Sequence, residues 1–258
     1  MTALCELLGI SANAPIDARR YLTEFYSHSV RHPHGWGLMR AAAGKTEIIK
    51  EPACAAKSDI IEKIIDETEP QTNMLAHIRL ATVGATKYDN CHPYTGFDAS
   101  GRRWTLIHNG TIYSGVQLAR YLSEQSGDTD SERIFLYLLD EINKAIILND
   151  APLSKEQRCF VINKIATVLA PRNKLNLMIH DGEVLYVHKN MRDTLSFKRL
   201  DEGIIFSTQP LDDNGWESFP MTQLMAFESG RCIFKGTNHG NEFIPTLEYI
   251  TALDAMNI

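Results

Sequence analysis

The stretch Cys5-Glu6-Leu7-Leu8-Gly9-Ile10-Ser11-Ala12-Asn13 decides how the rest of the chain is interpreted. It places a thiol close to the amino terminus, at the start of a short apolar run that predicts a buried strand. A cysteine at the very terminus can use its own α-amine, whose ordinary pKa is about 7.7 to 8.0, as the base for its thiol. No other segment offers a comparable nucleophile, so Cys5 is the candidate catalytic residue.

Composition and charge are those of an ordinary folded protein. The chain has 258 residues, of which 44% are hydrophobic and 22% are charged. Its formal net charge is −6, and no cluster of Lys and Arg stands out, which argues against a nucleic acid or an anionic membrane surface as a partner. The longest apolar runs stop far short of the roughly 20 residues that cross a bilayer. The first 30 residues lack a signal pattern, so we expect a cytoplasmic protein.

The five cysteines are an odd number and contain no CxxC pair, which predicts free thiols rather than a disulfide framework or a structural zinc site. No group of carboxylates and histidines has the spacing of metal ligands, and we expect neither a metal nor a cofactor.

Hydrophobic periodicity predicts an α+β layered fold, because strands dominate both ends of the chain and helices its middle. The expected helices cover 17–32, 58–65, 115–123, 130–147 and 154–169, with Asp17 and Ser58 as caps of the first two. The expected strands begin at Cys5 and then cover 34–39, 46–50, 73–80, 103–108, 175–179, 183–187, 204–207, 223–227 and 231–234. No linker interrupts the pattern, so residues 5–258 are expected to form one domain, with the last ~20 residues as a surface tail.

Four motifs follow one another in a fixed order. Cys5 begins the first strand, Arg79 lies in His77-Ile78-Arg79-Leu80-Ala81-Thr82, Asn109-Gly110 follows a strand as a turn, and Asp130 lies in Thr129-Asp130-Ser131-Glu132. Taken singly, each has an ordinary explanation. In the same order, these are a buried thiol, an ion pair at a strand edge, a turn and a helix cap. Taken together, they resemble the class II glutamine amidotransferases, whose glutaminase domains are N-terminal nucleophile hydrolases. The resemblance covers most of residues 5–235 and is strongest to small stand-alone bacterial proteins of that class.

The resemblance implies a four-layer αββα sandwich, in which two antiparallel sheets are flanked by helices. It also implies that Cys5 attacks the side-chain amide carbon of glutamine, forms a thioester and releases ammonia. The Asn109 side chain and the Gly110 backbone N–H would form the oxyanion hole.

The substrate contacts implied by the resemblance involve further residues. Arg79 would bind the α-carboxylate of glutamine with two parallel hydrogen bonds, and Asp130 its α-ammonium group. Thr82 and Val83 are expected as secondary contacts. His92 falls where related enzymes carry a histidine near the site, although loop packing explains it equally well.

Three further features are expected to support the site. His77 and His108 are expected to be buried hydrogen-bond donors behind it. Gly35-Trp36-Gly37 matches a family segment that packs against the nucleophile and is expected to be structural.

The four residues before Cys5 depart from the family pattern, because a nitrogen in a peptide bond with Leu4 cannot act as a base. Three explanations stay open. Residues 1–4 are a leader that is removed, or translation starts at a leucine codon at Leu4 that is read as methionine, or the extension stays and the protein is not a working hydrolase. We favour the start at Leu4, since removal of that methionine exposes the Cys5 amine.

Three functions are consistent with this sequence. The first is a glutaminase that passes ammonia to an unknown acceptor, with a separate synthase subunit as partner. The second is a hydrolase of γ-glutamyl peptides or conjugates. The third, from a different class, is a glutamine-sensing module whose Cys5 stays blocked. All three bind glutamine or a γ-glutamyl compound, and all three are compatible with a homodimer.

Overall fold

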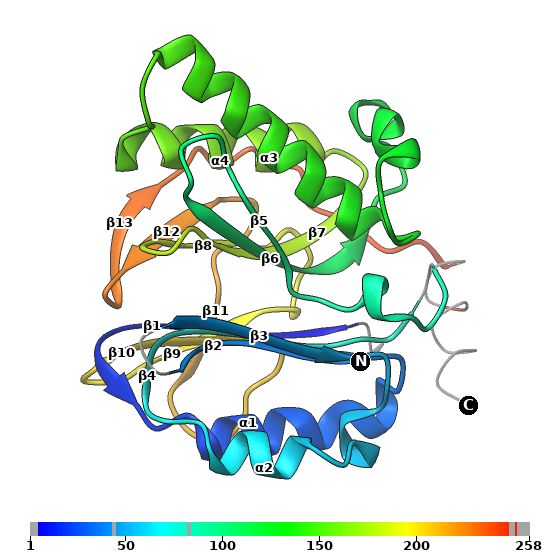
Figure 1. The fold of residues 1–258 in the computed structure, drawn as a ribbon, viewed down its shortest axis with the longest axis vertical. Helices are drawn as coiled ribbons and strands as arrows, with labels where there is room; N and C mark the ends of the chain where they lie inside the picture. The colour runs from blue at the N-terminus through cyan, green and yellow to red at the C-terminus, as the bar shows by residue number, and fades with distance from the viewer. Residues whose placement is uncertain (1–4, 43–44, 82–83, 248–250, 252–258) are drawn as a thin grey trace.

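The computed structural model describes residues 5–42, 45–81, 84–247 and 251, which form four stacked layers. Two β-sheets lie face to face in the middle, and helices cover the outer face of each (Figure 1). Every pair of neighbouring strands is antiparallel. The αββα sandwich predicted from the family resemblance is confirmed.

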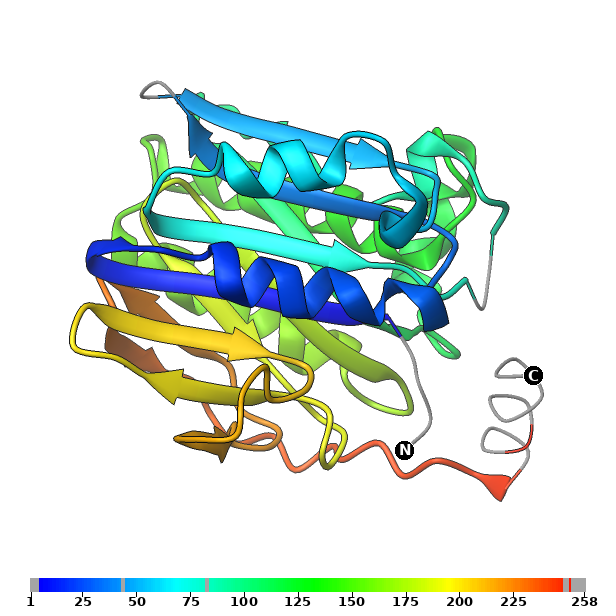
Figure 2. The same ribbon diagram turned by 90° about the horizontal axis from the view of Figure 1, so that it is seen from below.

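The first sheet has seven strands in the order β11-β9-β10-β1-β4-β2-β3. Its strands are β1 (Glu6–Ile16), β2 (Trp36–Ala42), β3 (Lys45–Glu51), β4 (Gln71–Ile78), β9 (Ser196–Arg199), β10 (Gly203–Ser207) and β11 (Trp216–Ser218). Figure 2 shows β1 in dark blue at the centre of this sheet, between cyan β4 and yellow β10.

The second sheet has six strands in the order β13-β12-β8-β7-β6-β5. Its strands are β5 (Tyr94–Phe97), β6 (Arg103–Thr111), β7 (Lys174–His180), β8 (Leu185–His188), β12 (Met225–Glu228) and β13 (Arg231–Lys235). Strands β6 and β7 pair over seven residues, from Thr105 opposite His180 to Thr111 opposite Lys174.

Four α-helices and four short 3₁₀ helices complete the described residues. The α-helices are α1 (Arg19–Ser27), α2 (Ile61–Asp66), α3 (Asp130–Asn149) and α4 (Lys155–Leu169), and the 3₁₀ helices are η1 (His28–Arg31), η2 (Ala55–Lys57), η3 (Tyr88–Asn90) and η4 (Val116–Ser123). Across the ranges that the structure describes, no helix combines the length and apolar character needed to cross a bilayer.

The alternation of side chains along β1 explains why it lies at the centre of the stack. Successive residues of a strand point to opposite faces. Leu8 and Ile10 pack with α1 and α2, whereas Leu7 packs between the two sheets. At Gly9, which faces the second sheet, an added Cβ would lie 2.6 Å from the Met178 Sδ atom. A glycine there lets the two sheets approach closely.

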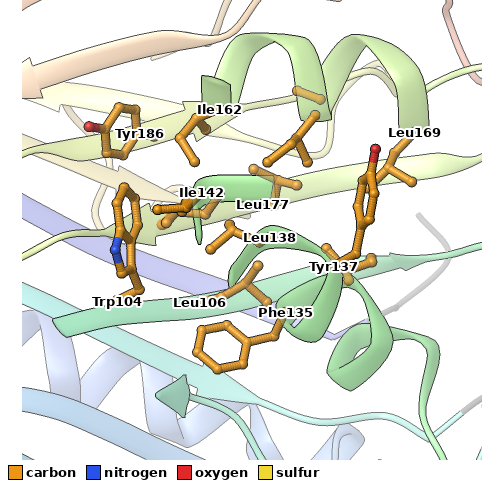
Figure 3. Close-up of a cluster of buried hydrophobic side chains, with 14 of the residues drawn as sticks. Trp104, Leu106, Phe135, Tyr137, Leu138, Ile142, Ile162, Leu169, Leu177 and Tyr186 are labelled. Atoms are coloured by element: carbon orange, nitrogen blue, oxygen red, sulfur yellow. The ribbon is translucent and has the colours of Figure 1, made fainter. Parts of the chain in front are cut away.

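The outer face of the second sheet carries the largest buried apolar cluster, between β6, β7 and the helices α3 and α4. Figure 3 shows that Leu138 and Ile142 of α3 reach toward Leu106 and Leu177 of the sheet. Trp104 and Tyr186 stack at one side of the cluster, with ring centroids 6.1 Å apart. This cluster fixes α3, whose first residue is Asp130, on the sheet.

Several local predictions were wrong. Asn109-Gly110 is not a turn, because β6 continues to Thr111 and pairs these two residues with Asn176 and Leu175. The helix predicted over 115–123 is present over 116–123 as a 3₁₀ helix. Strands β5, β9 and β11 were not predicted at all.

Both predicted helix caps were also wrong. β1 continues to Ile16, so α1 begins at Arg19 with Ala18 at its N-cap, and Asp17 lies outside the helix. α2 begins only at Ile61, with Ile60 at its N-cap. The Ser58 hydroxyl donates to Glu51 and accepts from the Ile60 N–H, and it bonds no N–H of the helix itself.

The role of the α3 cluster can be tested with two identical substitutions in one helix. Leu138 is fully buried, whereas Leu148, near the end of the same helix, is 88% exposed. Leu138→Ala should lower the free energy of unfolding by about 2–5 kcal/mol, because it removes packed atoms and leaves a cavity. Leu148→Ala should change it by less than about 0.5 kcal/mol. Urea unfolding followed by circular dichroism measures both, and equal losses would mean that α3 is not anchored through this cluster.

Candidate active site

Cys5 lies beside Arg79, where the central strands of the first sheet end. Glu6 is paired with Ile78 across β1 and β4, so the residues just outside this pair are neighbours. The Cys5 thiol donates to the Leu80 carbonyl oxygen over 3.3 Å. Burial raises the pKa of the Cys5 thiol, and the positive charges of Arg79 and Lys174 act in the opposite direction. A thiolate at this position would therefore depend on those two cations.

Asn109 of β6 lies on the second sheet and is almost fully buried. Its side-chain oxygen Oδ1 accepts a hydrogen bond from the Lys174 Nζ atom of β7 over 2.7 Å. The neighbouring Gly110 has no room for a side chain, because a Cβ would lie 2.0 Å from the Lys174 carbonyl oxygen. The Asn-Gly pair is thus explained by close strand packing rather than by a turn.

Asp130 is tied to the same strand end. Its Oδ2 atom accepts a hydrogen bond from the Ile112 backbone N–H over 2.7 Å, directly after β6. The cap of α3 is Thr129, whose hydroxyl accepts from the Glu132 N–H over 3.2 Å. Capping, the ordinary structural explanation for Asp130, is therefore not its role.

The Arg79 side chain is buried beneath the segment that follows it. Its guanidinium donates to the carbonyl oxygens of Gly84 and Ala85, each over 3.1 Å. Its backbone N–H donates to the Gly35 carbonyl over 2.8 Å, so the Gly35-Trp36-Gly37 segment supports the backbone of Arg79. Thr82 and Val83 lie outside the described residues.

Three buried histidines lie near these residues. The His77 and His92 rings pack against each other with centroids 4.0 Å apart, and burial lowers the pKa of each well below its usual value. Burial also lowers the pKa of His108, whose Nδ1 atom is hydrogen-bonded to the Ser131 hydroxyl over 2.9 Å. The His77 ring also faces the His108 backbone, which raises the pKa of His77 and so opposes the effect of burial.

Lys174 is the functional candidate that the sequence did not reveal. The predicted strand began one residue later, at Leu175, and a lysine at the start of a strand usually indicates a solvated end. In the structure Lys174 is fully buried, and its charge acts on the Cys5 thiol. The residues before it, Pro171-Arg172-Asn173, are polar and give no hint that Lys174 is buried.

The structure thus joins Cys5 and Arg79 on one sheet to Asn109 and Lys174 on the other. Among the residues that the structure describes, no three His, Cys, Asp or Glu side chains are arranged to hold a metal ion.

The comparisons with known proteins identify one family. The family model for class II glutamine amidotransferases matches residues 4–201. A protein of Methanocaldococcus jannaschii, MJ1515, is 29% identical over 264 residues, which cover 90% of this chain and 71% of that protein. The Escherichia coli K12 protein YafJ, whose name calls it a putative glutamine amidotransferase, is 28% identical over 72% of each chain.

A solved structure supports the fold. The crystal structure of a predicted glutamine amidotransferase from Pseudomonas aeruginosa superposes with a TM-score of 0.62, at 21% identity, over 89% of this chain and all of that one. Since the family model matches most of the sequence and the fold agrees, the chain belongs to the class II glutamine amidotransferases, enzymes that use a cysteine nucleophile on an amide.

Proposed function

We propose that this protein hydrolyses the side-chain amide of glutamine through a thioester on Cys5. The sulfur attacks the amide carbon, the carbon–nitrogen bond breaks, and ammonia leaves with the proton taken from the thiol. Water then cleaves the thioester, which gives glutamate and restores the thiol. The observation that carries the proposal is the meeting of Cys5 and Arg79 on one sheet with Asn109 on the other, in a chain of this family.

Each neighbouring group suits a part of glutamine. The Asn109 amide and the Gly110 N–H would stabilise the negative charge that develops on the amide oxygen. The guanidinium of Arg79 matches the α-carboxylate, and the carboxylate of Asp130 matches the α-ammonium group. We propose Thr82 and Val83 as further substrate contacts.

His92 is assigned a packing role in this proposal. Its ring contacts are with His77 and with Tyr94, whose ring centroid lies 4.9 Å away. Both contacts fix the wall of the site rather than the substrate.

The proposed base is the α-amine of Cys5, which requires that residues 1–4 be absent from the active form. An amide nitrogen cannot take the thiol proton, whereas a free amine with a pKa of about 7.7 to 8.0 can. Burial raises the pKa of the Cys5 thiol, so an adjacent base would be needed for attack near neutral pH. Ammonia would be released to a separate synthase subunit or to solvent.

A shortened chain tests the base directly. A gene encoding Met followed by Cys5 yields a chain with a free Cys5 amine after removal of the methionine. We expect this chain to release glutamate and ammonia from glutamine in equal amounts, and the unprocessed 258-residue chain to be at least about 100-fold slower. Mass spectrometry of the amino-terminal peptide verifies each form, and Cys5→Ala in the shortened chain is the blank.

Two results would contradict the proposal. Turnover of γ-glutamyl peptides without turnover of glutamine would assign a different donor. Heat of glutamine binding in calorimetry without glutamate release from the shortened chain would indicate a sensing module.

The role of Asp130 can be tested against a second aspartate of the same helix. Asp130→Asn keeps an oxygen that can accept from the Ile112 N–H but removes the charge that would bind an ammonium group. We expect its KM for glutamine to rise about 10-fold or more, with a smaller change in kcat, since a charge-assisted hydrogen bond contributes about 1.5–3 kcal/mol.

The control is Asp140→Asn. Asp140 accepts from the Tyr121 hydroxyl and forms a salt bridge with Arg120, on the outer side of the helical layer. This variant should leave KM unchanged. Equal KM values for all three proteins would remove Asp130 from the substrate site.

A further inference from the structure

Lys174 is a buried cation whose partner is uncharged. Its side chain is fully buried, and its only hydrogen bond within the described ranges is the 2.7 Å bond to Asn109 Oδ1. A lysine ammonium has three donors, and burial of a charge without a counter-charge is costly. A neutral apolar side chain would fill this position at lower cost, so the lysine calls for a functional explanation.

Other buried cations of the chain are satisfied differently. The Arg158 guanidinium, also buried, forms salt bridges with Asp181 over 2.7 Å and with Glu183 over 2.6 Å. Lys189, the other fully buried lysine, donates to the Leu195 carbonyl and to the Ser218 hydroxyl. Lys174 differs from both because its acceptor is a proposed catalytic side chain.

The chemistry of the pair fixes the orientation of the Asn109 amide. A protonated lysine is a donor only, so the atom that faces it must be the amide oxygen. The amide nitrogen Nδ2 then points away from Lys174, and no described residue accepts its hydrogen bond. That is the orientation in which Asn109 can donate to an oxygen of the substrate.

We propose that Lys174 is a positioning residue, which holds Asn109 with its Nδ2 donor toward the reacting carbonyl oxygen and places a positive charge beside the Cys5 thiol. The inference deepens the proposed glutaminase function and rests on it for the identity of that carbonyl group. Lys174 acts through Asn109 and through its charge.

The charges around Lys174 support this role. The positive charge of Lys174 favours the Cys5 thiolate, and the thiolate in turn raises the pKa of Lys174. Arg79 on the first sheet also lowers the pKa of Cys5. Burial lowers the pKa of His108 of β6, so this ring is neutral although the charge of Asp130 acts in the opposite direction. Burial lowers the pKa of Lys174 to about 7, so its charge is lost as the pH rises through that value.

Two substitutions separate the hydrogen bond from the charge. Lys174→Met removes both at similar length, whereas Lys174→Gln keeps an N–H donor for Asn109 Oδ1 but carries no charge. The matched control is Lys189→Met, which removes a second buried lysine whose pKa burial lowers to about 8. Circular dichroism and the midpoint of urea unfolding establish that each variant is folded.

The first readout is glutamine turnover by the shortened chain that begins at Cys5. Lys174→Met should lower kcat about 100-fold, the loss typical of one oxyanion-hole donor, with KM changed less than about 3-fold. Lys174→Gln should recover about 10-fold of that loss, because Asn109 is again held. A kcat that is unchanged in Lys174→Met, while the wild type turns over glutamine, would overturn the inference and leave the proposed function standing.

The second readout does not need the proposed activity. The rate of alkylation of Cys5 by iodoacetamide, followed against pH by mass spectrometry of the Cys5 peptide, gives the pKa of the thiol in the full 258-residue chain. There the Cys5 nitrogen is an amide, so the α-amine cannot contribute. At pH 6, where Lys174 is charged, Cys5 should be alkylated about 10-fold more slowly in both Lys174 variants than in the wild type, because less thiolate is present. Lys189→Met should leave the rate at this pH unchanged, and at pH 9, where Lys174 is neutral, the variants should react like the wild type.

Cys232, which is also partly exposed, provides an internal reference in the same samples. An alkylation rate of Cys5 at pH 6 that stays the same in both Lys174 variants would overturn the electrostatic part of the inference, even if the wild type proves inactive toward glutamine. A decrease of equal size in Lys189→Met or at Cys232 would mean that the effect is not specific to Lys174, and would overturn it as well.

Discussion

Burial of β1 on both faces is the constraint on which the rest of the molecule depends. All its residues from Glu6 to Ala12 are buried. This includes Glu6, the first residue of β1, although its side chain is a carboxylate. Glu6 is accommodated because it accepts hydrogen bonds from His28 and from Gln209, each over 2.8 Å. The hydrogen bond to Glu6 raises the pKa of His28, which strengthens the pair as an ion pair. The residue after the nucleophile is therefore fixed by two segments that lie far apart in the sequence.

The sequence predicted most strands and helices from local patterns, and it predicted the four layers through the family resemblance. Alternating and helical periodicities identified most elements, and the order of Cys5, Arg79, Asn109 and Asp130 indicated the family. The predictions failed where tertiary pairing overrides local preference. Asn-Gly favours a turn in isolation, but pairing with β7 keeps Asn109 and Gly110 extended.

Other features could not be read from the sequence because their partners lie far away in the chain. The Ser58 hydroxyl donates to Glu51, which lies on β3, and α2 begins only three residues after Ser58. Lys174 and Asn109 are 65 residues apart, and only the register of β6 on β7 brings them together. The burial of Lys174 depends on the stacking of the second sheet on the first, which no local sequence pattern indicates. Roles that depend on distant partners thus become visible only in the fold.

Uncharged acceptors hold both cations of the site. Arg79 donates to main-chain carbonyl oxygens, and Lys174 donates to an amide oxygen. Such acceptors orient a cation without cancelling its charge, and the charges of Arg79 and Lys174 both favour the Cys5 thiolate. A positive region of this kind suits a thiolate, a developing oxyanion and the carboxylate of an amino acid substrate.

The pairing of β1 with β10 has a consequence for synthesis of the protein on the ribosome. Leu8 is paired with Ser207, so one long edge of this apolar strand stays open until about 200 further residues have been made. At roughly 5–20 residues per second, this takes on the order of 10 to 40 s. Throughout that time β1 exposes backbone groups and leucine side chains that other nascent chains could pair with. The strand that follows Cys5 thus stays open to non-native pairing through most of the synthesis of the chain.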